Sequence, residues 1–99
     1  MASRQPFFFD ALEKYDPEFY KAASALRISA EGNALDEKTR VLITMALDAS
    51  HGSVGGVKNL AKRARALGAT EDQVRETLRL VASVNLNMAL HASLHAFEE

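Results

Sequence analysis

Two short segments of the sequence carry the side chains that could do chemistry. The first lies between residues 48 and 60 and contains His51, Ser53, Gly55 and Gly56. A serine can cap a helix start, and glycines let a ligand approach free backbone N–H groups, which is how helix N-termini hold carboxylate or phosphate. The alternative is that the glycines only loosen a joint between two helices, since they match no phosphate-loop signature.

The second segment is the tail, where His91 and His95 stand four residues apart and therefore share a helix face. Neutral imidazole can shuttle a proton or ligate a metal near pH 7. The His-Glu-x-x-His signature is missing, and two histidines alone make an incomplete metal shell. We assign no metal site, but three interpretations of the pair stay open. The histidines are metal ligands if His51 or a neighbouring subunit completes the shell, or they are ligand-contacting and acid/base groups, or they face solvent.

Composition excludes several function classes. The 99 residues include no cysteine, which rules out disulfides, thiolate metal sites and thiol catalysis in this chain. A formal net charge of −1 argues against binding to nucleic acid or to an acidic membrane. No apolar run approaches the roughly 20 residues of a membrane span, and the first residues lack the apolar core of a signal peptide. We expect a cytoplasmic protein with no cofactor and no nucleic-acid or membrane partner.

Capping signals mark where helices begin near the start of the chain. Asp10 and Glu13 have the spacing of a capping box. Asp16 fits an N-cap, and Pro17 fits the first helical position that follows it. Apolar residues then recur with helical periodicity, which predicts a helix from about residue 17 to 31.

Three further helices follow in the pattern. Asp36 caps the next one, Gly68 ends the one after it, and Thr70 with Gln73 forms another capping box that starts the last. The segment 85–99 either continues this last helix or follows a kink near its start. No stretch shows sustained alternation with β-branched residues, so the fold class predicted is all-α.

Apolar residues cover nearly every side of the helix that Asp36 caps. A helix of this kind is central or lies in a subunit interface. We therefore expect a homo-oligomer. The residues concerned are Val41, Leu42, Ile43, Met45, Ala46, Leu47 and Ala49.

Three stretches in order resemble the markers of the carboxymuconolactone decarboxylase family, which also contains the AhpD-like alkylhydroperoxidases. Residues 35–43 (LDEKTRVLI) are similar to a helix opening of the family. Residues 64–74 (ARALGATEDQV) are similar to its helix that ends in Gly-Ala-Thr before an acidic residue and a new helix. Residues 89–97 (ALHASLHAF) resemble the closing helix of the decarboxylases, with a histidine at His95. With an Asp-Pro-Glu helix near the start, the resemblance covers about residues 7–97.

This resemblance implies a single domain over residues 1–99. The implied fold is an AhpD-like helical bundle that assembles into a homotrimer or a homohexamer. Such an assembly is consistent with the small core that a chain of this length can build for itself.

The resemblance also locates the reactive positions of the family. The peroxidase branch has a Cys-x-x-Cys pair, a histidine four residues later and a glutamate on the preceding helix. Counted back from Gly68, these positions fall on Ser53, Gly56, Leu60 and Val41. A chain without cysteine cannot form the disulfide of a peroxide-reducing cycle, so that activity is excluded. The decarboxylases also have a histidine where Leu60 stands.

Two functions stay open on this sequence. The first is a lyase acting on a small carboxylated or lactone-type molecule, with backbone N–H groups holding a carboxylate or developing enolate and a histidine moving the proton. The second is a non-catalytic, oligomeric ligand-binding or scaffold member of the family. The residues assigned to the site are, for catalysis, His95, His51 and Ser53 and, for substrate binding, Gly55, Gly56 and His91.

Overall fold

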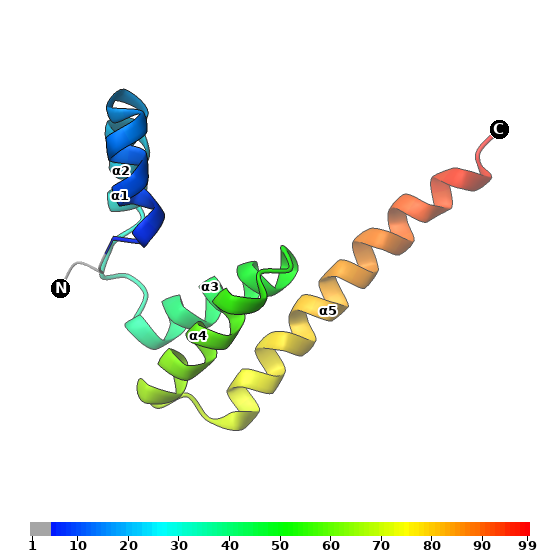
Figure 1. Ribbon diagram of the computed structural model, residues 1–99. Helices are drawn as coiled ribbons and strands as arrows, with labels where there is room; N and C mark the ends of the chain where they lie inside the picture. Colours follow the sequence, from blue (N-terminus) through cyan, green and yellow to red (C-terminus); the bar gives the residue numbers. More distant parts are fainter. Residues whose placement is uncertain (1–4) are drawn as a thin grey trace. The chain divides into compact units, whose positions relative to one another are not determined.

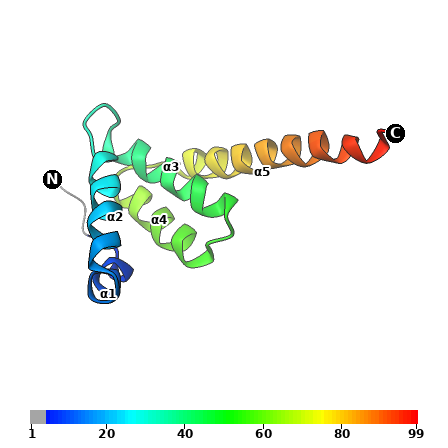
Figure 2. The same cartoon turned by 90° about the horizontal axis from the view of Figure 1, so that it is seen from above.

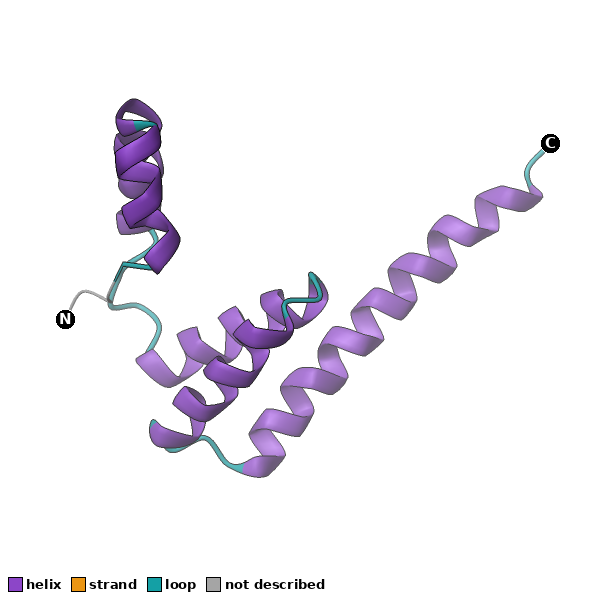
Figure 3. Ribbon diagram, in the orientation of Figure 1, coloured by secondary structure: helices purple, strands orange, loops and turns teal. Residues whose placement is uncertain are grey.

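The computed structural model describes residues 5–99, and over this range the chain is helical without any strand, so the all-α prediction is confirmed (Figures 1 and 3). The opening segment, which we predict not to be a signal peptide, begins with residues 1–4, and these lie outside the described range. The elements are α1 (Phe7–Tyr15), α2 (Pro17–Ser29), α3 (Glu37–Ser50), α4 (Val54–Ala66), α5 (Glu71–Leu94) and the short 3-10 helix η1 (His95–Phe97).

The chain divides into two compact units, one ending at Ala34 and the other beginning at Leu35. The first unit is the hairpin of α1 and α2. The Asp16 carboxylate accepts a hydrogen bond from the Phe19 N–H at 3.1 Å, with Pro17 at the start of α2, as the sequence predicts. Neither helix contains a buried residue, so the hairpin has no core of its own.

The capping box expected at Asp10 and Glu13 is wrong. Helix α1 begins at Phe7, four residues before the start that a cap at Asp10 would give, because Pro6 occupies its N-cap position. Asp10 therefore stands inside the first turn, where its Oδ1 accepts a hydrogen bond from Nε2 of Gln5 at 2.7 Å.

The second unit contains α3, α4, α5 and η1, and its small apolar core lies among α3, α4 and the first turn of α5 (Figure 2). Met45 of α3 is fully buried at its centre. The partly buried Leu60 and Leu67 of α4 pack against this centre together with other apolar residues. The buried core residues are Val41, Met45, Ala64, Ala69 and Val74.

Glycines with positive φ make both joints in the second unit. After α3, Gly52 has φ 77°, and the next N–H, of Ser53, donates to the carbonyl of Asp48 at 2.9 Å. After α4, Gly68 has φ 95°, and the N–H of Ala69 donates to the carbonyl of Ala64 at 2.9 Å. Both helices end in a Schellman motif, whose residue after the C-cap has a positive φ. Glycine adopts this conformation most easily because it has no Cβ. The predicted end of a helix at Gly68 is confirmed.

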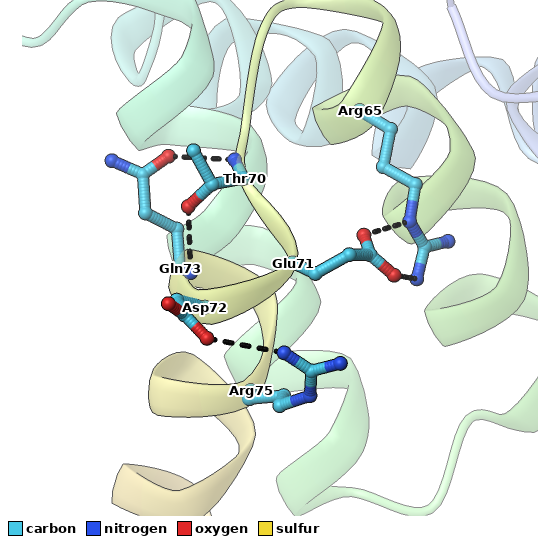
Figure 4. Close-up of polar contacts among 6 residues, drawn as sticks. All are labelled: Arg65, Thr70, Glu71, Asp72, Gln73 and Arg75. Atoms are coloured by element: carbon cyan, nitrogen blue, oxygen red, sulfur yellow. Dashed lines mark hydrogen bonds and ion pairs between the residues drawn. The ribbon is translucent and has the colours of Figure 1, made fainter.

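The start of α5 is fixed by a cluster of polar contacts (Figure 4). The Thr70 hydroxyl accepts from the Gln73 N–H, and the Gln73 side chain accepts from the Thr70 N–H, both at 3.0 Å, which confirms the predicted capping box. Arg65 of α4 donates to both oxygens of Glu71 at 2.7 and 3.1 Å. This bidentate contact lowers the pKa of Glu71 and raises that of Arg65.

Helix α5 runs without a break from Glu71 to Leu94 and continues directly into η1. Of the two alternatives for segment 85–99, the continuous helix is therefore the one observed. At 1.5 Å per residue, α5 is about 36 Å long, more than α3 or α4 can cover. Figure 1 shows its C-terminal end standing clear of both.

Candidate functional site

The six residues assigned to a site from sequence lie at two separate places in the second unit. Four of them lie at the joint between α3 and α4: His51 and Ser53 in the turn itself, and Gly55 and Gly56 in the first turn of α4. His91 lies near the end of α5, and His95 is the first residue of η1. Figures 1 and 2 show the joint beside the middle of α5, where the Ser50 hydroxyl bonds to the Asn85 side chain at 3.3 Å. Asn85 precedes His95 by ten residues, about 15 Å of helix. One chain therefore does not bring the two groups together.

His51 and Ser53 are the residues that flank the turn of the joint. His51 caps the C-terminus of α3, and its Nδ1 lies 2.8 Å from the carbonyl oxygen of Leu47, to which it donates in the Nδ1-protonated tautomer. Ser53 occupies the predicted N-cap position of α4, but its side chain makes no capping hydrogen bond. Both side chains are exposed. The joint thus offers an imidazole and a hydroxyl to solvent.

Gly56 differs from Gly55 in what surrounds it. A Cβ on Gly55 would meet nothing within 4 Å. A Cβ on Gly56 would collide with the carboxylate of Asp48 and would lie 2.8 Å from the Ser53 hydroxyl oxygen. Glycine at position 56 therefore lets Asp48, from α3, bring its carboxylate against the first turn of α4, where a helix N-terminus favours an anion.

Asp48 was not among the residues assigned from sequence. Its carboxylate stands against the first turn of α4, where a ligand carboxylate was expected to bind. The signal that points to it is the combination of an acidic residue one turn before a helix end and a glycine in the first turn of the next helix. A ligand that binds this N-terminus must first displace Asp48.

His91 and His95 form an edge-to-face pair with ring centroids 5.6 Å apart. Nδ1 of His95 lies 2.7 Å from Oε1 of Glu98, and both side chains are more than half exposed. A carboxylate that orients an imidazole is a suitable arrangement for proton transfer. Among residues 5–99, no group of three histidine or acidic side chains is placed to hold a metal ion.

The resemblance places a glutamate and a histidine of the peroxidase branch at Val41 and Leu60, and both are apolar packing positions in this chain. Val41 is only 5% exposed, and Leu60 packs against the cluster that contains it. The structure fills both positions with core contacts.

An apolar groove of about 460 Å³ lies between α3 and α5. None of its lining residues is charged, and none was assigned to the site from sequence. The apolar character of α3 on nearly all sides was the sequence signal for this surface. The lining residues are Thr39, Leu42, Ile43, Ala46, Leu47, Ser50, Thr77, Leu80, Val81, Val84 and Asn85.

Over residues 5–99 the protein is a small all-helical one. Comparison with known families makes the assignment specific: the profile of the carboxymuconolactone decarboxylase family matches residues 17–99. The chain belongs to this family. It is also similar to the uncharacterized protein MJ1511 of Methanocaldococcus jannaschii, with 32% identity over 73 residues, which is 73% of this chain and 68% of the relative. Among the described residues, no helix is both long and apolar enough to cross a membrane.

Proposed function

We propose that this chain is a non-catalytic, homo-oligomeric member of its family that assembles through the apolar surfaces of α3 and α5. The observation that carries the proposal is the exposed end of α5. We call residues 86–97 the free end of α5, and this segment includes η1. Every residue of the free end is exposed, although several are large and apolar: Leu86 is 57% exposed, Met88 66%, Leu90 56%, Leu94 66% and Phe97 83%.

An apolar surface of this extent is the mark of an interaction site rather than of a solvated helix. Long helices in water also depend on tertiary packing for most of their stability. A helix that continues for several turns beyond its own packing partners is therefore best explained by contacts with another molecule. The family supports a second copy of the chain as that molecule, with three or six copies in the assembly.

The apolar residues Val41 and Leu60 support the non-catalytic part of the proposal. Neither side chain can accept or donate a proton, and both contribute to the core. A substitution that restores a histidine at position 60 would place an imidazole among apolar neighbours, where its charged form is disfavoured.

Gel filtration coupled to light scattering tests the assembly. At micromolar concentration we expect a mass of three or six copies. A monomer under these conditions would contradict the proposal.

A second candidate is a lyase that acts on a small carboxylated or lactone-type molecule, and the contact between His95 and Glu98 favours it. In this scheme His95 of one copy meets the α3–α4 joint of another, where His51 and the backbone N–H groups near Ser53 bind the substrate. The test is a panel of lactones and small carboxylates with carbon dioxide release as the readout. Activity that His95→Ala abolishes, while the assembly persists, would establish this candidate over the non-catalytic one.

A further inference from the structure

His91, in the last turn of α5, and His95, the first residue of η1, place two imidazoles on one helix face. The ring centroids are 5.6 Å apart and the ring planes stand at 87°. Two histidines four residues apart on a helix are the zinc ligands of the His-Glu-x-x-His motif, whose glutamate acts as a base and not as a ligand. Ala92 stands at the position of that glutamate, but the spacing of the two nitrogen ligands is kept.

The distance between the two rings fits a tetrahedral ion. With a zinc–nitrogen bond of about 2.0–2.1 Å, two imidazoles on one tetrahedral zinc ion have ring centroids about 5.2 Å apart. A square-planar ion such as Cu²⁺ would bring the centroids to about 4.5 Å. The observed 5.6 Å is closer to the tetrahedral value. Because both side chains are exposed, small rotations can turn one nitrogen of each ring toward the same point.

Glu98 orients the ring of His95. Its Oε1 lies 2.7 Å from Nδ1 of His95, and at this distance a neutral ring donates its Nδ1–H to the carboxylate. Nε2 then keeps a free lone pair. Histidines that bind metals almost always donate their other N–H to a carboxylate, a carbonyl or a water in this way. His95 therefore has the tautomer of a metal ligand, and Glu98 is its positioning residue.

The charges around the two histidines favour a cation. Residues 80–99 contain no lysine or arginine and two glutamates, Glu98 and Glu99. Among residues 5–99, no third histidine or acidic side chain is placed to join the pair as a ligand. An ion held here therefore keeps water at its remaining positions, as in zinc sites with an open coordination position.

We propose that His91 and His95 chelate one zinc ion per chain through one nitrogen each, with Glu98 orienting His95 and water completing the shell. The ion joins the last turn of α5 to η1. It therefore holds in helical form a segment against which the second unit packs no other helix. The proposal goes beyond the assembly proposed above and does not depend on it.

The zinc site and the apolar surface of the free end use different faces of the helix. At about 100° per residue, the midpoint of the two histidines lies about 120° around the helix from a row of large apolar residues. An assembly that covers this row can therefore leave both imidazoles in contact with solvent. The row consists of Leu86, Leu90, Leu94 and Phe97.

Isothermal titration calorimetry with zinc chloride at pH 7.5 tests the site on the full chain, purified without a histidine tag. We expect one zinc ion per chain. His91→Gln and His95→Gln should each weaken binding at least about tenfold, because loss of an outer-shell partner alone costs about 10–100-fold in metal affinity. His51→Gln, which removes the histidine at the α3–α4 joint, should leave the affinity unchanged.

The double variant His91→Gln/Ser93→His is the matched control for spacing. It keeps three histidines but sets two of them two residues apart, where helix side chains do not face each other. It should bind zinc as weakly as His91→Gln. A parent protein that binds no zinc, a His91→Gln variant that binds as the parent does, or a double variant that does so would each overturn the proposal. Half an ion per chain would show that zinc bridges two chains and would contradict the chelate within one.

Glu98→Ala tests the positioning role. It should weaken zinc binding about tenfold, the lower end of the range, because Glu98 is 68% exposed. Glu99→Ala removes the same charge one residue further along and should have little effect. An equal loss in both variants would show that negative charge alone attracts the ion, and it would overturn the positioning role of Glu98.

Amide hydrogen exchange of the dilute protein tests whether the ion holds the end of the helix. Only the helical turn brings the two imidazoles together, so zinc at a hundred times its dissociation constant should slow the exchange of residues 92–97 by up to about a hundredfold. The double variant His91→Gln/Ser93→His should show no such slowing. Unchanged exchange of these residues in the parent with zinc bound would contradict the joining of α5 to η1.

Discussion

The two ends of α5 belong to one helix but are stabilised in different ways. The first turns are capped by Thr70, held by the Arg65–Glu71 contact and anchored by Val74, which is 5% exposed. The free end has good helix formers such as alanine, leucine and methionine, but it has no packing partner within the second unit. The difference teaches that helical propensity can extend α5, whereas packing against other residues is needed to hold it in place. The second unit does not supply this packing at the free end.

The largest expected effect is a difference in stability loss between a variant of Met45, in the core, and a variant of Met88, on the free end. Met45→Ala removes the one large side chain that is fully buried among residues 5–99, and it should lower the free energy of unfolding by about 2–5 kcal/mol. Met88→Ala, on the free end, should leave the unfolding of the diluted monomer unchanged and weaken only the assembly. Urea denaturation at two protein concentrations measures both. Equal losses in the diluted protein would remove the distinction between core and free end.

The next effect concerns how α5 begins. Thr70→Ala deletes one arm of the capping box and should lower the free energy of unfolding by about 1 kcal/mol. Ser53→Ala is the matched control, since Ser53 stands at an N-cap position without a side-chain capping bond. Thermal denaturation should show a smaller loss for Ser53→Ala. An equal loss of unfolding free energy in both variants would show that the capping hydrogen bonds at Thr70 do not stabilise the protein.

The smallest effect is the pH dependence from Glu71. Its pKa is lowered mainly by the hydrogen bonds from Arg65. Desolvation opposes this shift, and the charges of Arg65 and Arg75 each add a smaller lowering. A carboxyl group with a lowered folded pKa stabilises the protein above its ordinary pKa, and this contribution disappears as pH falls through the folded value. Glu71→Gln should therefore make stability fall less steeply in the acid range.

Arg65→Gln should flatten the acid range in the same way, because it removes the partner that lowers the pKa of Glu71. The double variant should add little to either single one. Melting temperatures between pH 3 and pH 7 provide the comparison. A fully additive double variant would show that the two side chains act independently.

Sequence patterns predicted the features that depend on neighbours within a few residues. The caps at Asp16 and Thr70 and the glycine ending at Gly68 follow from local hydrogen bonding, and all three are observed. The capping box at Asp10 failed for an equally local reason, since Pro6 starts the helix earlier.

Features that depend on how helices pack were not predicted. The contact of Asp48 with Gly56 joins two helices across a turn, and the α3–α5 groove joins residues nearly forty positions apart. The pairing of His95 with the α3–α4 joint was an inference from chemistry alone. Helix length decides against it within one chain, because about 15 Å of α5 separates Asn85, beside the joint, from His95.

The central claim is that the free end of α5 is covered by another copy of the chain. Amide hydrogen exchange of residues 86–97, followed by mass spectrometry at high and low protein concentration, tests it most directly. The account predicts slow exchange of the free end in the concentrated protein and fast exchange on dilution, while amides around Val74 stay protected in both. Fast exchange of the free end at every concentration would contradict it.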